Sequence, residues 1–471
     1  MKGIGLPSPL ATPSVLLLPL NNLTFFGETL SCDTDLSGDG LNDLVIGSPF
    51  AQTLNGFQSG RTDVFFAATK EWAPKVTVND ANWTLLGSDA YEWTGSASAA
   101  LANATSTLGV THEEIIRSAL GAQIEESTAT AILRAPTRCA HIIAITQAEL
   151  SSDTSKSTST TAAALLLIGS TGFRTTTPEL GRLEAGRVSA YLFPNPNSTT
   201  GALAACVRAS PVALFSITAD REGLAVEPMK AVKLGAAIAL GFPLGYTAPP
   251  HFAIGMPCVD FCGSSALIPN STQSVFNTSA GAVAIIPFSL ALRGDFLWSI
   301  ATTPGAPLFP RAMLASRLPD ARFGWRLSFA NVLPKVLPAD DLIVSAPMYS
   351  RLFIGDVKDT PAPTPIGDSG REVGAIFIYK GGSTSFPTGS ACAAENLSKW
   401  WAQGPVQFGR MGMSTVLFDW DGDGVDELVA GAPRAALDVG PQRREATVSD
   451  TGSEEYAGAL LVYANFTASS T

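Results

Sequence analysis

Two stretches of the chain share one pattern: Asp-Leu-Ser-Gly-Asp-Gly-Leu-Asn-Asp at residues 35–43 and Asp-Trp-Asp-Gly-Asp-Gly-Val-Asp-Glu at residues 419–427. Each places an oxygen-bearing side chain at positions 1, 3, 5 and 9 and a glycine at position 6. Ca²⁺ binds about six to eight oxygen ligands, which a tight loop supplies best from alternating positions. Glycine permits the sharp turn that this arrangement needs. The two stretches are therefore predicted to be calcium-binding loops.

The ligands expected for these two loops follow from the pattern. The first loop offers Asp35, Ser37, Asp39, the Leu41 carbonyl and Asp43, and the second offers Asp419, Asp421, Asp423, the Val425 carbonyl and Glu427. Ser37 gives a neutral oxygen where a carboxylate is commoner, so the first loop is expected to bind Ca²⁺ more weakly. About two structural Ca²⁺ ions are expected in all. The alternative for both loops is an Asp- and Gly-rich turn without a metal.

The sequence after each loop places it in a β-hairpin. The first loop runs into Leu44-Val45-Ile46 and the second into Leu428-Val429-Ala430, which are short apolar segments typical of strands. A helix–loop–helix calcium site would instead need a glutamate at about position 12 of the loop. Asp340-Asp341 precedes a similar apolar segment without an acidic loop before it. We interpret that pair as a turn.

The hairpins belong to a repeat. Glycines typical of a unit start occur at Gly27, Gly95, Gly235, Gly324 and Gly409, and each unit closes with a glycine followed by a small, apolar strand, beginning at Gly60, Gly186, Gly281, Gly374 and Gly458. Recurring β-rich units with glycine and aromatic signatures are typical of propellers. The predicted fold is an all-β propeller of four-stranded antiparallel blades. Five units are recognisable, and the repeat allows up to seven blades.

The predicted propeller covers residues 21–471, with an inserted loop rich in Ser, Thr and Ala at about 104–160. Such an insertion is tolerated because the entropy of loop closure rises only slowly with length. Residues 1–20 are interpreted as an N-terminal segment or as the remnant of a preceding blade. No stretch reaches the ~18 apolar residues that a membrane-spanning helix needs.

The units resemble the FG-GAP repeats of integrin α-subunits. The segments at 80–87, 47–51 and 165–170 further resemble the C-terminal propeller of glycosylphosphatidylinositol (GPI)-specific phospholipase D, and the similarity covers roughly residues 21–466. This resemblance implies a family that hydrolyses the inositol-phosphate linkage of GPI anchors. The family's catalytic domain is N-terminal and uses Zn²⁺, and nothing in this chain corresponds to it.

The residue inventory argues against catalysis by this chain alone. Its three histidines, His112, His141 and His251, are far apart in sequence, whereas a catalytic zinc site needs several ligands and an open position. No nucleophile elbow or phosphate-binding loop occurs. No catalytic residue is therefore assigned, and whether the chain is part of an enzyme remains open, because the resembled family is a phosphoric diester hydrolase.

Charge and glycosylation motifs bear on partners and location. The net charge of −11 disfavours nucleic acid, whose phosphates require basic patches. Asn-x-Ser/Thr motifs occur at eight positions and favour a secreted or lumenal protein: Asn22, Asn82, Asn103, Asn197, Asn270, Asn277, Asn396 and Asn465. Six cysteines suit that compartment and allow fifteen connectivities, with Cys258 and Cys262 as the favoured local pair; buried free thiols are the alternative.

Two functions are consistent with these observations. The first is a non-catalytic, calcium-stabilised propeller that acts as an accessory or recognition module for hydrolysis of GPI anchors, with a protein or a GPI-anchored glycoprotein as its ligand. The second is an integrin-α-like extracellular adhesion or ligand-binding propeller with no enzymatic partner.

Overall fold

The computed structural model describes residues 16–19, 25–67, 75–101, 163–177, 181–194, 212–220, 231–259, 279–288, 297–299, 312–316, 318, 320–334, 339–350, 372–382, 386–392, 394–405, 408–435 and 458–464. The predicted insertion at about 104–160 lies outside these residues. Cys262, the expected partner of Cys258, also lies outside them. Cys258 itself is a free cysteine, which does not bear out the expected pair.

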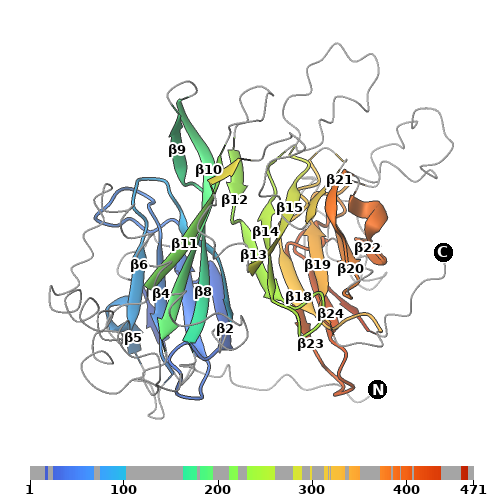
Figure 1. Cartoon of the computed structure of the whole chain (residues 1–471), viewed down its shortest axis with the longest axis horizontal. Coiled ribbons are helices and arrows are strands. Elements are labelled where there is room, and N and C mark those ends of the chain that lie inside the picture. The colour runs from blue at the N-terminus through green and yellow to red at the C-terminus, as the bar shows by residue number, and fades with distance from the viewer. Residues whose placement is uncertain are drawn as a thin grey trace, which may run out of the picture.

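The described residues form five consecutive antiparallel blades, which confirms the predicted propeller (Figure 1). The first blade contains β2 (Thr29–Thr34), β3 (Asp43–Ser48), β4 (Arg61–Phe65) and β6 (Trp83–Leu86), and the second contains β7 (Thr94–Leu101), β8 (Ala163–Ser170), β10 (Gly181–Pro194) and β11 (Val212–Asp220). The third contains β13 (Ala237–Gly241), β14 (His251–Met256), β15 (Ala282–Pro287) and β17 (Ala312–Ala315).

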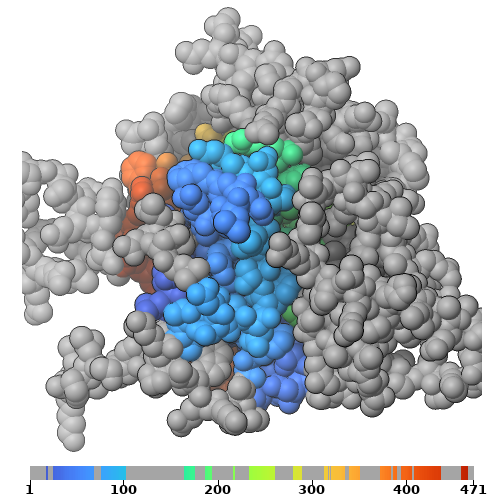
Figure 2. All heavy atoms as spheres, turned by 90° about the vertical axis from the view of Figure 1, so that its left-hand side faces the viewer, coloured from blue at the N-terminus to red at the C-terminus, as the bar shows by residue number. Residues whose placement is uncertain are grey.

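The fourth blade contains β18 (Leu327–Ala330), β19 (Asp341–Ala346), β20 (Ala375–Tyr379) and β22 (Trp400–Gln403). In the fifth, the described strands are β23 (Ser414–Phe418), β24 (Glu427–Ala432) and β25 (Ala459–Tyr463). Figure 2 shows the first blade in blue, with green residues of the second blade on one side of it in this view and orange and red residues on the other.

Short additional strands extend these sheets. β9 (Arg174–Thr177) and β12 (Ala231–Leu234) pair with β10, β16 (Leu297–Ser299) pairs with β11, and β21 (Gly389–Cys392) pairs with β17. β1 (Leu16–Leu18) runs parallel to β5 (Lys75–Thr77), so this part of the N-terminal segment lies beside the connection that follows β4. The described helices are the single turns η1 (Val78–Asp80) and η4 (Ala394–Leu397).

Glycines at the ends of the strands allow neighbouring blades to approach closely. The innermost strands pack in the order β2, β7, β13, β18. A Cβ atom on Gly47 would lie 2.2 Å from the carbonyl oxygen of Gly95, and one on Gly255 would lie 2.1 Å from that of Gly324. Real Cβ atoms do not approach backbone this closely, so the repeated glycines of the sequence are a steric requirement of packing blade against blade.

The structure corrects the start of the fifth unit. A parallel bridge joins the closing glycine of one blade to the residue before the start glycine of the next, as in Gly281↔Phe323 and Gly374↔Met411. The start glycine of the fifth blade is therefore Gly412, and the assignment to Gly409 was wrong by three residues. Phe408-Gly409 satisfies the sequence motif, but the bridge forms at Met411.

The residue two places before each start glycine has a left-handed backbone conformation. The φ angles are 46° at Phe25, 57° at Trp93 and 54° at Lys233, Arg322 and Arg410. Bulky L-residues rarely adopt positive φ, and they do so only where the surrounding structure enforces it. The bridge between blades supplies that constraint at Trp93, Lys233, Arg322 and Arg410, whatever the side chain.

Apolar cores lie between successive blades. Val45, Val64 and Ile168 belong to the core between the first two blades, and Ile343 and Leu428 belong to the core between the last two. On the fifth blade, the opposite face is exposed. It presents an apolar face made of Val416, Phe418, Leu460 and Val462, with Leu460 75% exposed.

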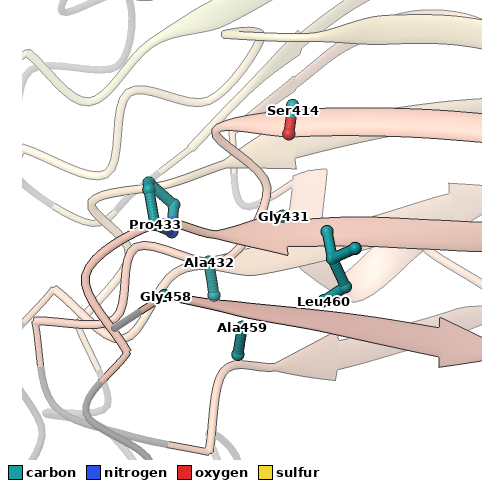
Figure 3. A pocket seen from close by; sticks show the side chains of 7 residues that line it. All are labelled: Ser414, Gly431, Ala432, Pro433, Gly458, Ala459 and Leu460. Carbon is teal, nitrogen blue, oxygen red and sulfur yellow. The ribbon is translucent and has the colours of Figure 1, made fainter. Parts of the chain in front are cut away.

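A shallow hollow lies at one end of the same blade (Figure 3). It is lined by Ser414, Gly431, Ala432, Pro433, Gly458, Ala459 and Leu460. These are mostly small residues, and the figure shows the Leu460 side chain projecting beside β24. The hollow has few polar groups and offers no constellation for chemistry.

Candidate metal loops

The second acidic loop joins β23 to β24 and gathers three carboxylates. The ligand oxygens of Asp419, Asp421 and Asp423 all lie within 4.8 Å of one another, and the three side chains are exposed. Asp419 organises the loop: its Oδ1 accepts hydrogen bonds from the amides of Gly422 at 2.7 Å and Asp423 at 3.1 Å, and its Oδ2 accepts one from Gly424 at 2.9 Å. The expected ligands at positions 1, 3 and 5 are thus brought together.

The remaining expected ligands of this loop lie where the chain enters β24. Glu427 is buried, and its Oε2 accepts a hydrogen bond from the Trp420 amide at 2.6 Å. The Val425 amide donates to Asp423 Oδ1 at 2.8 Å, which helps to fix the backbone that carries the Val425 carbonyl. Glu427 is therefore an anchor of the loop as well as a candidate ligand.

The first loop has the same backbone plan but a different arrangement of carboxylates. Asp35 accepts hydrogen bonds from the amides of Gly38 at 2.6 Å, Asp39 at 3.2 Å and Gly40 at 2.8 Å. Asp39 accepts one from the Leu41 amide at 2.9 Å. Within the described part of the chain, three mutually close carboxylates occur in the second loop and not in the first.

Asp43, the last acidic residue of the first loop, is engaged by backbone amides. Its Oδ2 accepts hydrogen bonds from Leu36 and Ser37 and its Oδ1 accepts one from Ala67, each at 2.7 Å. Burial raises the pKa of the Asp43 carboxyl above its ordinary value; the amides from Ala67, Ser37 and Leu36 oppose this rise, and the charge of Asp35 adds to it.

A third acidic residue has the same role in a blade without an acidic loop. Asp341 is fully buried, and its Oδ2 accepts hydrogen bonds from Val332 at 3.1 Å and Leu333 at 2.7 Å. Its Oδ1 accepts one from Gly381 at 2.7 Å. The turn expected at Asp340-Asp341 is not found: Asp340 directly precedes β19 and Asp341 is the first residue of that strand. The sequence reasoning also missed this anchoring role. The available signal was the acidic first residue of β3, β19 and β24.

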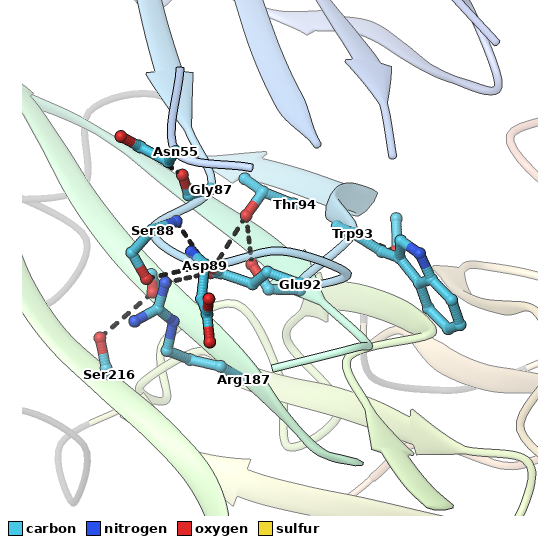
Figure 4. A network of polar contacts seen from close by, with 12 residues as sticks. Asn55, Gly87, Ser88, Asp89, Glu92, Trp93, Thr94, Arg187 and Ser216 are labelled. Carbon is cyan, nitrogen blue, oxygen red and sulfur yellow. Dashed lines mark hydrogen bonds and ion pairs between the residues drawn. The ribbon is translucent and has the colours of Figure 1, made fainter. Parts of the chain in front are cut away.

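The polar network around Glu92 is structural (Figure 4). Glu92 is buried, forms an ion pair with Arg187 on β10, and accepts hydrogen bonds from Ser88 Oγ at 2.8 Å and Thr94 Oγ1 at 3.1 Å. Thr94 in turn contacts Ser170 Oγ at 3.0 Å. These contacts fix the connection that leads from the first blade into β7.

The described residues supply no zinc constellation. His251 is buried, with Nδ1 3.1 Å from the Pro249 carbonyl oxygen, and His112 and His141 lie outside the described residues. Among the described side chains, only the second acidic loop brings three or more candidate metal ligands close enough to share one ion.

Asn82 and Asn396, two of the eight glycosylation motifs, are exposed, and the other six lie outside the described residues.

Comparisons with known proteins give no assignment: neither a scan against protein-family models nor a search of curated proteins finds a match to this chain. Among the described residues, no helix combines the length and apolarity needed to span a membrane.

Proposed function

We propose that this chain is a non-catalytic, calcium-stabilised β-propeller that serves as a recognition module, resembling the C-terminal part of GPI-specific phospholipase D. The observation that carries the calcium assignment is the gathering of Asp419, Asp421 and Asp423 within 4.8 Å in the β23–β24 hairpin. Three carboxylates this close repel one another, and a bound cation removes that penalty. Oxygen ligands of this kind suit Ca²⁺.

The two loops should differ in affinity. In the second loop, Glu427 Oε2 is occupied by the Trp420 amide, so Oε1 would be the ligand atom. In the first loop, the neutral Ser37 stands at position 3, where the second loop has the carboxylate of Asp421. The second loop would therefore bind Ca²⁺ more tightly than the first, because affinity rises with the number of charged ligands.

The recognition role rests on the resemblance and on the residue inventory. A GPI-anchored glycoprotein or another protein would be the ligand, in an extracellular or lumenal compartment. Hydrolysis, and the Zn²⁺ it requires, would belong to a catalytic domain of the kind the resembled family carries. This chain supplies no residue to that step.

Thermal unfolding with Ca²⁺ and with chelator, on one sample assayed for bound metal, tests the calcium assignment. A ligand that binds only the folded state raises the melting temperature. The double variant Asp421→Asn/Asp423→Asn should lose most of that rise, whereas Asp89→Asn, an exposed aspartate outside both loops, should keep it. Absence of bound metal, together with an unchanged melting temperature, would contradict the calcium assignment.

The second candidate, an integrin-α-like adhesion propeller, is consistent with the same hairpin loops. Binding to one glycoprotein, prepared with and without its GPI anchor, separates the two functions. Binding that requires the anchor supports the recognition module, whereas equal binding to both forms supports adhesion through the protein surface.

A further inference from the structure

A second hollow, of about 230 Å³, lies where the innermost strands of the propeller begin, and we call it the axial hollow. Four blades contribute to it through the segments around their start glycines, and the first three also contribute through the turns after their second strands. Its lining is distinctive for its charged and aromatic side chains, which are Glu28, Phe50, Trp93, Lys233, Arg322, Trp325 and Arg326.

The hollow and the acidic loops lie at opposite ends of the blades. In the first blade, Thr29 pairs with Gly47 at the end that borders the hollow, and Thr34 pairs with Asp43 at the end that borders the first acidic loop. The length of the strands separates these ends. A ligand in the hollow would therefore be independent of the proposed calcium sites.

The hollow is cationic in an acidic protein. Lys233, Arg322 and Arg326 line it together with a single carboxylate, Glu28, although the chain as a whole carries a net charge of −11. None of these three cations has an ion pair within the described residues, whereas Arg410, at the equivalent place in the fifth blade, is paired with Glu372. An excess of positive charge of this kind attracts small anions.

The cations are held in place by aromatic rings. The Lys233 Nζ lies 5.1 Å from the centre of the Trp93 ring, and the Arg322 Cζ lies 5.6 Å from that of Trp325. Trp93 packs edge-on against Phe50, with ring centres 5.8 Å apart. Cation–π contacts restrict long side chains, so less entropy is lost when a ligand engages them.

The Arg326 side chain is held by a hydrogen bond to the backbone of another blade. Its Nε donates a hydrogen bond to the Met413 carbonyl oxygen of the fifth blade at 3.3 Å. Burial lowers the pKa of its guanidinium from the ordinary value, and the charge of Glu28 opposes that shift. Arginine remains charged at neutral pH, and its terminal nitrogens are suited to oxyanions.

We propose that this axial hollow binds a small organic anion with a carboxylate or phosphate group, the oxyanion contacting Lys233, Arg322 and Arg326 and the carbon frame lying against Trp93 and Phe50. Guanidinium and ammonium groups make charge-assisted hydrogen bonds to such oxyanions. The volume is below the ~300–1,000 Å³ of sites for drug-sized ligands, which restricts the ligand to a compact molecule.

Isothermal titration calorimetry of the full chain in a buffer without added Ca²⁺ tests this proposal, since citrate and phosphate themselves bind that ion. The probes are citrate for carboxylates, inorganic phosphate for phosphates, and glycerol as a neutral control. Citrate or phosphate should bind and glycerol should not, and added salt should weaken the binding. Whichever anion binds more tightly identifies the preferred group.

Variants locate the site. Lys233→Gln and Arg322→Gln should each weaken binding about tenfold, the scale expected for one charge-assisted hydrogen bond. Glu28→Gln should strengthen binding, and Lys399→Gln, an exposed lysine outside the hollow, should leave it unchanged. Thermal melts of each variant establish that it is folded. If neither anion binds, or if binding is the same in folded Lys233→Gln and Arg322→Gln as in the parent, the proposal is overturned.

Discussion

Asp43 and Asp341 occupy equivalent places in the first and fourth blades and make equivalent hydrogen bonds. Each begins the second strand of its blade, accepts two amides from the preceding turn through Oδ2, and accepts one amide after the third strand through Oδ1. One carboxylate thus joins three backbone segments of a blade. This relationship holds whether or not the turn carries the acidic pattern.

We expect Asp341→Ala to reduce the free energy of unfolding by roughly 2–4 kcal/mol, because it leaves buried amide donors without an acceptor. Asp43→Ala should cost a similar amount. Denaturant unfolding provides the measurement. Asp33→Ala is the matched control, since Asp33 is exposed and its Oδ1 accepts a side-chain hydrogen bond from Ser31 at 2.8 Å. An equal loss in the control would contradict the anchoring role.

Gly255→Ala should destabilise the propeller by roughly 1–3 kcal/mol, because the new methyl group would overlap the Gly324 carbonyl of the next blade. Gly389→Ala is the comparison. Gly389 has a φ of +74°, but no atom lies within 4 Å of the place a Cβ would take, so this variant should lose only the cost of a left-handed alanine, about 1 kcal/mol. Calorimetric melting of both variants would show whether contact between blades outweighs backbone strain.

Ser37→Asp should convert the first acidic loop into a tighter calcium site, because it adds a carboxylate at position 3. The same change should lower stability in chelator, where the new charge faces Asp35, whose Oδ1 lies 3.4 Å from Ser37 Oγ. Ser37→Asn adds a neutral oxygen on a side chain about the size of aspartate, so it distinguishes the effect of the added charge from the effect of the added size. Calcium titration followed by metal analysis checks the expectation; equal affinities for all three proteins would refute it.

The exposed apolar face of the fifth blade should promote self-association. Leu460→Ser with Val462→Thr removes much of that face, because the two side chains are 75% and 59% exposed. Their exposure means that the stability of the monomer should change by no more than about 0.5 kcal/mol. Sedimentation velocity over a concentration series would detect the lower association. An unchanged distribution of species would show that this face does not drive contact between molecules.

Stability should fall at alkaline pH through Tyr349. Burial raises the pKa of Tyr349 from 10.0 to about 12, with the charge of Glu395 adding to the effect. A group whose folded pKa is raised stabilises the fold below its unfolded pKa, and this contribution is lost as pH rises from 10.0 to about 12. Tyr349→Phe should therefore lose stability less steeply across that interval. Urea unfolding at a series of pH values would reveal the difference, and identical slopes would rule the tyrosine out.

The fold was predictable from sequence because its determinants are local. The glycine at the close contact between blades, such as Gly47 or Gly255, recurs with a hydrophobic strand on its N-terminal side, and both features are visible in the chain itself. The start of the fifth blade was misplaced because Phe408-Gly409 and Met411-Gly412 are both plausible motifs. The choice depends on a bridge to Gly374, which sequence does not show.

The candidate sites likewise contain some features that the sequence predicts and others that it does not. Asp419, Asp421 and Asp423 form one local loop, so their grouping follows from spacing. The third hydrogen bond of Asp341 comes from Gly381, 40 positions away, and depends on how the blade folds. The axial hollow combines side chains from four blades, and no run of basic residues in the sequence marks Lys233 and Arg322 as neighbours of one cavity.

The residue two places before each start glycine has a left-handed backbone in every blade, but its side chain varies among the blades. At four of these places, Trp93, Lys233, Arg322 and Arg410, the backbone is set by the bridge between blades, and the side chains differ. Because the bridge involves only main-chain atoms, the identity of each side chain is free to vary without rebuilding the blade. A propeller of this kind can acquire a new specificity at its axis by single substitutions, leaving the cores and the acidic hairpins untouched.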